Sequence, residues 1–585
     1  MSPLRTHLFS ALHLASAALS AASALSPSCK AVPGTRAWPS SQDWARFNES
    51  LAGRLLQPPP PGAVCHPGQA SYNPAECPAV QAAWSTYEFH QANPVSMDWN
   101  QWTNDSCLPQ QSAPCSGQGY PVFVVNATEA RHVQLGVQFA RKNNIRLVVK
   151  SSGHDYIGRS NAPNSLSIWT HHLRDVKTHD SFHPSRCKAT IEGTAVTVGA
   201  GMQMWDLYNK LDTLGQTLVG GGGKTVSVGG YATGAGHSLL SARYGLAADN
   251  VLEMEVVTPK GELVIANECQ NKDLFWAMRG GGGSTFAVMT SVTFKTYPSP
   301  KIEQLTLVIA TNDVSNPRPI FDMVAYVLSQ FPSLGDQGLS GYSYFFPSIR
   351  NPFDGGATTV GGMFMAAVLQ DSSPEAMHKL WDPVLAHINV TWPGLFQVIY
   401  QPKSFPSFLG WYEENYDTSA AGQNSYLGSR LLDKTALTAN LTKSSAALER
   451  FANGTLSTAY LVSGKGVHNA QPRGCGNAVL PAWRKAYVHA TFGIDVPPLD
   501  PAAAATARRQ VKGRVAALRE LAPDMGAYMN EADFEEPNWQ KEFWGSNYRR
   551  LLQIKRAVDP DDVLWCTPCV GNERWEQVGD RLCRV

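Results

Sequence analysis

The sequence has little charge, no bias toward one sign of charge and no long apolar run beyond its first residues. Only 16% of its 585 residues are charged, and the net charge is +1. Near-neutral charge gives no electrostatic reason for nucleic acid or an anionic membrane as a partner. No segment past the N-terminus has the roughly 18 uninterrupted apolar residues of a membrane-spanning helix. We therefore expect neither nucleic acid nor a membrane as a partner. We also expect the protein to be a monomer that acts on a small-molecule substrate.

Two common nucleotide-binding fingerprints are missing as well. Gly220–Thr225 (GGGGKT) resembles a P-loop, but a P-loop needs glycine five residues before its Gly-Lys pair, where Leu218 stands. No Gly-X-Gly-X-X-Gly stands between a predicted strand and a predicted helix, which argues against a nicotinamide-binding Rossmann fold. His171-His172 has no third ligand at a suitable spacing. We therefore predict no metal site.

The N-terminus is typical of a secreted protein. Residues 1–24 contain one Arg followed by an Ala-, Leu- and Ser-rich run that ends in small residues, as in a signal peptide. Asn-X-Ser/Thr sequons, the acceptor sites for N-glycosylation, occur six times. They lie at Asn48, Asn104, Asn126, Asn389, Asn440 and Asn453. These features predict a secreted glycoprotein.

The 11 cysteines agree with an oxidising compartment. Several lie close together in sequence: Cys65 with Cys77, Cys107 with Cys115, and Cys566 with Cys569. In an oxidising compartment such cysteines form disulfides, and an odd count leaves at least one thiol free or intermolecular. Zinc is the alternative for Cys566 and Cys569, but only Cys583 follows them as a further ligand.

The pattern along the chain predicts an α+β protein. Residues 25–117 form a Cys- and Pro-rich N-terminal segment. A strand over 121–125, a helix capped by Asn126 or Thr128 and running to about 142, and a strand over 145–149 then make a β-α-β unit with parallel strands. From 301 to 520 the glycine-rich loops cease. Strands such as 304–310 and 361–369 and a helix over 501–521 indicate a second domain there.

Two glycine-rich loops are the strongest functional signal in the residues themselves. The first, KSSGHDYIGRS, spans 150–160 and follows the second strand of the β-α-β unit. The second spans 220–238. Glycines let backbone N–H groups approach an oxyanion closely, and Ser151 and Ser152 add hydroxyl donors. These residues alone leave four roles open for His154: a spectator bonded to backbone, a metal ligand, a base, or an attachment point.

Four ordered blocks resemble the FAD-linked oxidases related to vanillyl-alcohol oxidase, in particular the berberine-bridge-enzyme-like branch. The first is the 150–160 loop, which looks like the pyrophosphate loop of that branch. The others are TVSVGGYATGAG at 225–236, DLFWAMRGGGG at 273–283, and NYRRL at 547–551, followed by Lys555 and Asp559-Pro560. The likeness covers about residues 118 to 570.

This resemblance implies a fold, a cofactor and a set of cofactor-binding residues. The fold is a bipartite PCMH-type FAD-binding domain of two α/β subdomains, over 118–300 and 521–585, with an inserted antiparallel-sheet substrate domain over 301–520. The cofactor is FAD, bonded through its 8α carbon to the His154 ring. The residues expected to hold FAD beside His154 are Ser151, Ser152, Gly153, Asp155, Gly158, Ser160, Gly229, Gly230, Thr233, Gly234, Gly236 and Asn547.

The sequence departs from the branch at three places. Many members carry a second covalent link from a cysteine at the start of the second loop, where this chain has Gly223. We therefore predict a single link, through His154. His237 replaces a usual Tyr, and Thr285 replaces a usual Asn. These two changes bear on the detailed contacts with FAD.

The resemblance also implies the chemistry. The branch draws its base from the block aligned with residues 526–533, where Tyr528 and Glu531 are the candidates. Each has a plainer alternative: packing for Tyr528 and a solvated charge for Glu531. We expect an oxidase that transfers hydride from an alcohol, an amine or an activated C–H to FAD and then to O2, giving H2O2, in secondary metabolism. Small side chains at Val226 and Val228 favour reaction with O2. A dehydrogenase with another acceptor, and a binding protein without catalysis, are the alternatives.

Overall fold

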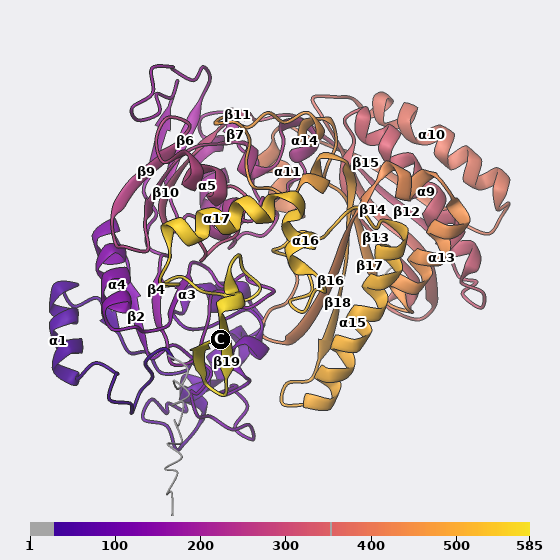
Figure 1. Ribbon diagram of the computed structural model, residues 1–585. Helices are drawn as coiled ribbons and strands as arrows, with labels where there is room; N and C mark the ends of the chain where they lie inside the picture. Colours follow the sequence, from indigo (N-terminus) through magenta and orange to yellow (C-terminus); the bar gives the residue numbers. More distant parts are fainter. Residues whose placement is uncertain (1–28, 352–353) are drawn as a thin grey trace, which may run out of the picture.

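The computed structural model describes residues 29–351 and 354–585 and has the predicted α+β fold (Figure 1). The predicted signal peptide lies outside the described residues. Three sheets dominate the molecule, with four, five and seven strands. The first two belong to the part of the chain that resembles the FAD-binding domain, except for one edge strand from the N-terminal segment, and the third belongs to the inserted part.

The four-stranded sheet contains the predicted β-α-β unit. Strand β2 (Phe123–Asn126), helix α4 (Ala130–Lys142) and strand β3 (Leu147–Lys150) follow one another. β2 and β3 run in the same direction, but β4 (Leu166–Trp169) lies between them and is parallel to both, giving the order β1-β2-β4-β3 with β1 (Leu55–Leu56) at the edge. The buried face of α4 carries Val133, Val137 and Ala140. The predicted caps were wrong: the N-cap is Glu129, whose side chain makes no capping bond.

The five-stranded sheet follows in the order β5-β6-β10-β8-β9 and is antiparallel. Its strands are β5 (Val176–His179), β6 (Ala195–Gly199), β8 (Val251–Val257), β9 (Leu263–Asn267) and β10 (Val288–Lys295). Helices α5 (Met204–Asp212), α6 (Val228–Thr233) and α8 (Lys272–Met278) accompany it. The second glycine-rich loop runs through α6, so this sheet carries that loop.

The seven-stranded antiparallel sheet has the order β15-β12-β14-β13-β17-β18-β16. Its strands are β12 (Ile302–Thr311), β13 (Ser340–Arg350), β14 (Thr359–Gln370), β15 (Gln397–Phe405), β16 (Asn424–Asp433), β17 (Ser457–Leu461) and β18 (Ala486–Val496). The helices packed on it include α9 (Arg318–Asp336), α10 (Pro374–Thr391), α13 (Leu441–Ala452) and α15 (Pro501–Leu521) (Figure 1). The sheet's other face is therefore available to the glycine-rich loops.

After α15 the chain returns to the first part of the molecule. Helices α16 (Trp539–Trp544) and α17 (Tyr548–Val558) come next, and α17 packs against α8 (Figure 1). The ammonium of Lys555, on α17, donates to the backbone oxygen of Thr285 at 2.8 Å and to Asp559 at 2.6 Å. The chain ends in a hairpin of β19 (Trp575–Val578) and β20 (Arg581–Arg584). Across the described ranges, no helix is both long and apolar enough to cross a membrane.

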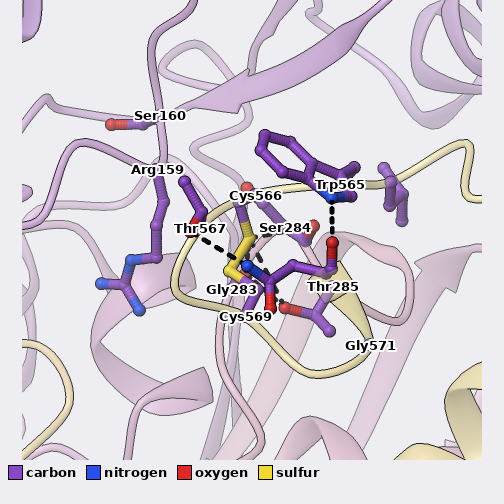
Figure 2. The surroundings of a disulfide bond; sticks show 12 residues. Arg159, Ser160, Gly283, Ser284, Thr285, Trp565, Cys566, Thr567, Cys569 and Gly571 are labelled. Carbon is purple, nitrogen blue, oxygen red and sulfur yellow. Dashed lines mark hydrogen bonds between the residues drawn. A yellow bond between two sulfur atoms is a disulfide. The ribbon is translucent and has the colours of Figure 1, made fainter. Parts of the chain in front are cut away.

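Ten of the cysteines form five disulfides, and the exposed Cys475 is free. The three short-range pairs are confirmed as disulfides, and two long-range ones join Cys29 to Cys583 and Cys187 to Cys269. Cys566 and Cys569 are bonded to each other, which disfavours the zinc alternative. Their disulfide packs against the glycine run, with Cys566 Sγ 3.8 Å from the backbone oxygen of Gly283 and 3.7 Å from that of Ser284 (Figure 2).

Candidate active site

The first glycine-rich loop begins where β3 ends and bends sharply at two glycines. Gly153 has φ +106° and Gly158 has φ +72°, values that side chains with a Cβ rarely adopt. At Gly158 a Cβ would also lie 2.4 Å from the Trp102 ring. Trp102 belongs to the N-terminal segment. The close contact between this segment and the loop therefore requires glycine at position 158.

The two glycine-rich loops meet through their side chains. Ser227 Oγ donates to Ser151 Oγ at 2.7 Å and to Ser152 Oγ at 3.2 Å. A hydrogen bond of 2.6 Å joins His154 Nε2 to Thr225 Oγ1. Because about 70 residues separate the two loops in sequence, these bonds fix both around one shared space.

The surroundings of His154 keep its imidazole neutral. Burial is the largest cause and the charge of Lys150 the next, and together they lower the pKa of His154 to about 3. The Tyr87 ring packs on the imidazole with its centroid 4.5 Å away. Asp98 Oδ2 lies 3.4 Å from His154 Nδ1. A neutral imidazole keeps a lone pair and can act as a nucleophile.

The residues around His154 fit FAD. A Cβ built on Gly223 would lie 4.0 Å from His154 Cε1, so a side chain at position 223 would lie beside the imidazole. Gly230 is exposed, with nothing within 4 Å of a Cβ built on it, which leaves its backbone open to a ligand. The hydroxyls of the two loops, open glycine backbone and a neutral imidazole are the donors and the nucleophile that a flavin with a pyrophosphate needs.

The other predicted cofactor-binding residues include several that shape the loops. Asp155 Oδ2 accepts from Ser160 N at 2.7 Å and from Ser160 Oγ at 3.0 Å. Thr233 Oγ1 donates to the backbone oxygen of Gly229 at 2.9 Å. A Cβ on Gly234 would lie 2.2 Å from the amide nitrogen of Asn530, so this glycine lets the C-terminal segment approach.

Gly236 and Asn547 complete the predicted set. Gly236 has φ +70°, and a Cβ there would lie 2.8 Å from the Tyr231 ring. Asn547 lies apart from the two loops, and its amide donates to the backbone oxygen of Val479 at 2.9 Å. Its cofactor contact stays a prediction.

Glu531 lies between two histidines from other parts of the chain. His489 Nε2, on β18, donates to Glu531 Oε2 at 2.9 Å, and His237 Nε2 lies 3.2 Å from both carboxylate oxygens. The Glu531 side chain is 27% exposed, whereas that of His489 is fully buried. Sequence reasoning selected Glu531, noted His237 only as a departure from the family pattern, and missed His489.

The two imidazoles hold the Glu531 carboxylate in its charged form. Burial alone would raise the pKa of Glu531, but the two histidines outweigh burial and keep that pKa well below its usual range. Burial lowers the pKa of His489. The cluster is therefore an ionised carboxylate held by two imidazole N–H groups.

Tyr528 borders the same cluster. Its ring centroid lies 5.3 Å from that of His237 and 5.7 Å from that of His489. Its hydroxyl oxygen accepts from Asn530 Nδ2 at 2.9 Å. Burial, followed by the charge of Glu531, raises the pKa of Tyr528 far above its usual range. The phenol therefore stays protonated, and its own O–H is available as a donor.

A metal site is an alternative interpretation of His237, His489 and Glu531, since their ligand atoms lie within 4.8 Å of one another. A histidine that binds metal almost always donates its second ring N–H to an acceptor. Within the described ranges, the Nδ1 atoms of His237 and His489 are both buried and have no partner. The geometry therefore favours a hydrogen-bonded acid–base group over a metal centre.

A cluster of tyrosines on the seven-stranded sheet adjoins this group, and the Tyr460 ring centroid lies 6.4 Å from that of His489. Tyr342 and Tyr344 lie two residues apart on β13 and therefore on the same face of the strand. Tyr460 lies on the neighbouring strand β17, with its ring centroid 5.0 Å from that of Tyr342. The Tyr342 hydroxyl would lie 3.6 Å from a Cβ on Gly222, in the second loop. Tyr156 of the first loop packs on Trp99, with ring centroids 3.9 Å apart. The sequence alone marked none of these residues as functional, because aromatic residues are used more often in cores.

Two family descriptions match the chain. The description "FAD binding domain" matches residues 121–267, and "Berberine and berberine like" matches residues 527–570. The first matched range holds both glycine-rich loops, and the second holds Tyr528 and Glu531.

Individual proteins match over nearly the whole chain. An FAD-linked oxidoreductase of Arthroderma benhamiae is 35% identical over 559 residues, covering 92% of each chain. The crystal structure of the VAO-type flavoprotein MtVAO713 from Myceliophthora thermophila C1 is 28% identical, with a TM-score of 0.89 over 96% of this chain and 100% of that chain. Glucooligosaccharide oxidase from Acremonium strictum, described with a 6-S-cysteinyl, 8α-N1-histidyl FAD, shares the fold at 18% identity, with a TM-score of 0.63 over 77% and 92%.

Proposed function

The chain belongs to the FAD-linked oxidoreductases of the vanillyl-alcohol-oxidase and berberine-bridge-enzyme-like family, and from this premise we propose that it is a secreted oxidase. It removes hydride from a carbon that bears a hydroxyl or amine, or from an activated C–H. It then passes the electrons to O2, which is reduced to H2O2. The observation that carries the proposal is the Glu531 carboxylate held between His489 and His237, the latter at the end of the second glycine-rich loop.

His154 is proposed as the sole covalent link to FAD. Bound FAD supplies the hydride acceptor, and the chain supplies position and proton transfer. The neutral His154 imidazole supports the link, as does the histidyl linkage described for the Acremonium oxidase. The FAD of that oxidase also has a cysteinyl link, whose counterpart here is predicted at Gly223, where no sulfur is present. The two loops would hold the pyrophosphate with serine hydroxyls and backbone amides.

Glu531 is proposed as the proton acceptor of the reaction. Oxidation of an alcohol or amine removes an O–H or N–H proton as hydride leaves the neighbouring carbon. A carboxylate within hydrogen-bond reach can take that proton. Glu531 is ionised and partly exposed, while His237 and His489 fix its orientation. Tyr528, protonated beside it, would donate a hydrogen bond to the substrate oxygen or nitrogen.

The tyrosines of the second domain support a substrate with an aromatic or hydrophobic part. Tyr342, Tyr344 and Tyr460 offer ring faces and hydroxyl groups together. The same combination also suits a sugar ring, so a carbohydrate alcohol is a second substrate class to test. We place the activity in secondary metabolism, and the small side chains of Val226 and Val228 support O2 as the acceptor.

Secretion and glycosylation are supported by exposure and by cysteine use. Four of the six sequon asparagines are exposed: Asn104, Asn389, Asn440 and Asn453. The five disulfides suit an oxidising compartment.

The test of this function is a substrate panel of benzylic alcohols, amines and oligosaccharides, read in two ways. In air, hydrogen peroxide should form with a member of the panel. Without O2, the same compound should bleach the flavin absorbance. Admitting air should restore that absorbance at least as fast as the enzyme turns over. Bleaching followed by slow recovery would favour a dehydrogenase, and a preparation without flavin would favour a binding protein. Either result would overturn the oxidase.

A further inference from the structure

The carboxylate beside His154 has no hydrogen bond to explain its burial. Asp98 is 0% exposed, and in the part of the chain that the structure describes neither of its carboxylate oxygens has a hydrogen-bond partner. Its Oδ2 lies 3.4 Å from His154 Nδ1. Burying a carboxylate without a partner is costly. Packing alone would be served as well by an uncharged side chain of the same shape.

The backbone around Asp98 is anchored to the substrate domain, which fixes where the carboxylate stands. Asp98 follows α3 (Tyr87–Ala92) in the N-terminal segment. Its backbone oxygen accepts from Gly422 N at 2.7 Å, and Asn100 Nδ2 donates to the backbone oxygen of Gly422 at 2.8 Å. The carboxylate is thus brought to His154 from outside the FAD-binding sequence blocks.

The other charged or titratable groups near His154 cannot take a proton from it easily. The Lys150 ammonium has no lone pair with which to accept a proton, and it donates to the backbone oxygens of His90 and Asn93 at 3.2 and 2.9 Å. His90 is bonded at both ring nitrogens, to Ser96 Oγ and to the backbone oxygen of Trp84. Tyr87, whose ring covers His154, has its hydroxyl bonded to Ser419 Oγ at 2.8 Å. Asp98 is the group in contact with the imidazole that is free to accept.

We propose that Asp98 is the positioning residue that accepts the imidazole proton when the link to FAD forms, an inference that rests on the proposed covalent role of His154. A ring nitrogen of His154 bonds to the 8α carbon, and the imidazole must then lose its N–H proton or become cationic in a buried site. Asp98 takes that proton.

The atoms and electrons of this step balance. One N–H and one C–H bond are lost, and one N–C bond is formed. Bound FAD would take up the electron pair and the C–H proton while Asp98 holds the N–H proton. O2, the oxidant, would then remove the electron pair and both protons as H2O2. Asp98 is needed once in the life of each molecule, when the link is made, and not in each turnover.

The test compares the wild type, Asp98→Asn and a matched control, Asp105→Asn. Asp105 is a buried aspartate of the same segment, but it bonds to Asn424 Nδ2 and to Leu499 N, away from His154. Total flavin is measured from the absorbance of the folded protein, and covalent flavin from fluorescence of the band on a denaturing gel. We expect at least a fivefold lower ratio of covalent to total flavin in Asp98→Asn and an unchanged ratio in Asp105→Asn.

Rescue separates a chemical role from a structural one, and it also serves if Asp98→Asn folds poorly. In Asp98→Ala, formate added with FAD should restore covalent incorporation, whereas chloride at the same ionic strength should not. An unchanged covalent ratio in Asp98→Asn, or no effect of formate in Asp98→Ala, overturns the role of Asp98. Absence of covalent flavin in the wild type overturns instead the link on which the role rests, so the two failures are distinguishable.

Discussion

Two histidine–carboxylate groups adjoin the glycine-rich loops of this molecule, and they differ in what their carboxylates can do. Asp98 is sealed from solvent and has no hydrogen-bond partner among the described residues, and burial raises its pKa well above the usual range. Glu531 is 27% exposed and accepts from two imidazoles, which keep its pKa low. We infer two tasks for one class of residue: Asp98 accepts a proton once, and Glu531 exchanges its proton in every cycle.

The largest effect is expected from removing the tether. His154→Ala should abolish covalent flavin, because no cysteine stands at Gly223 to replace the link. Denaturing gels under ultraviolet light should show no fluorescent band for this variant. The control is His172→Ala, whose ring bonds to Asn126 on the surface and should leave the band intact. Persistent fluorescence in His154→Ala would mean that another residue carries the flavin.

Changes in the group around Glu531 should show the opposite pattern, with turnover lost and covalent flavin retained. Glu531→Gln keeps the shape of the side chain but removes the proton acceptor, so kcat should fall by about 10²–10⁴-fold. The ratio of covalent to total flavin should stay at the wild-type level. Steady-state oxygen consumption and gel fluorescence on the same preparation check both parts. A normal kcat in this variant would move the proton acceptor elsewhere.

The groups around Asp98 and Glu531 show how much of the candidate site could be predicted from the sequence. The two glycine-rich loops could be predicted from the residues themselves, because backbone N–H groups reach an oxyanion most closely at glycine. The choice of His154 and Glu531 and the bipartite fold came from the resemblance of four short blocks to the family. The insertion of β4 between β2 and β3 could not be read, because strand order is set by tertiary packing. Asp98, His489 and Tyr460 could not be found either. Each comes from a segment without a local signature and meets the site only through the fold.

The histidines around Glu531 should set the pH dependence of turnover. Removing a donor to an ionised carboxylate raises the pKa of that carboxyl, so the proton-accepting form is lost at a higher pH. His489→Phe should therefore move the acid limb of the kcat/KM profile upward by about one pH unit. His237→Phe should move it in the same direction. A profile that does not move, measured with the same substrate, would detach the two imidazoles from the proton acceptor.

The smallest of these effects is expected at Tyr528. Tyr528→Phe removes a hydrogen bond to the substrate but neither the acceptor nor the tether, so kcat/KM should fall by about tenfold, as for the loss of about one hydrogen bond. The acid limb should stay in place, because Glu531 keeps both histidines. A loss as large as that of Glu531→Gln would make Tyr528 the proton-transfer residue and Glu531 its support.

Whether His154 alone carries the flavin is tested most directly by peptide mapping of the purified yellow protein after acid precipitation and digestion. We expect a single flavin-bearing peptide, containing His154, whose fragment ions place the modification on that histidine. A pellet that loses its colour to the supernatant, or a flavin found on any other residue, would contradict the tether and the role of Asp98 that depends on it.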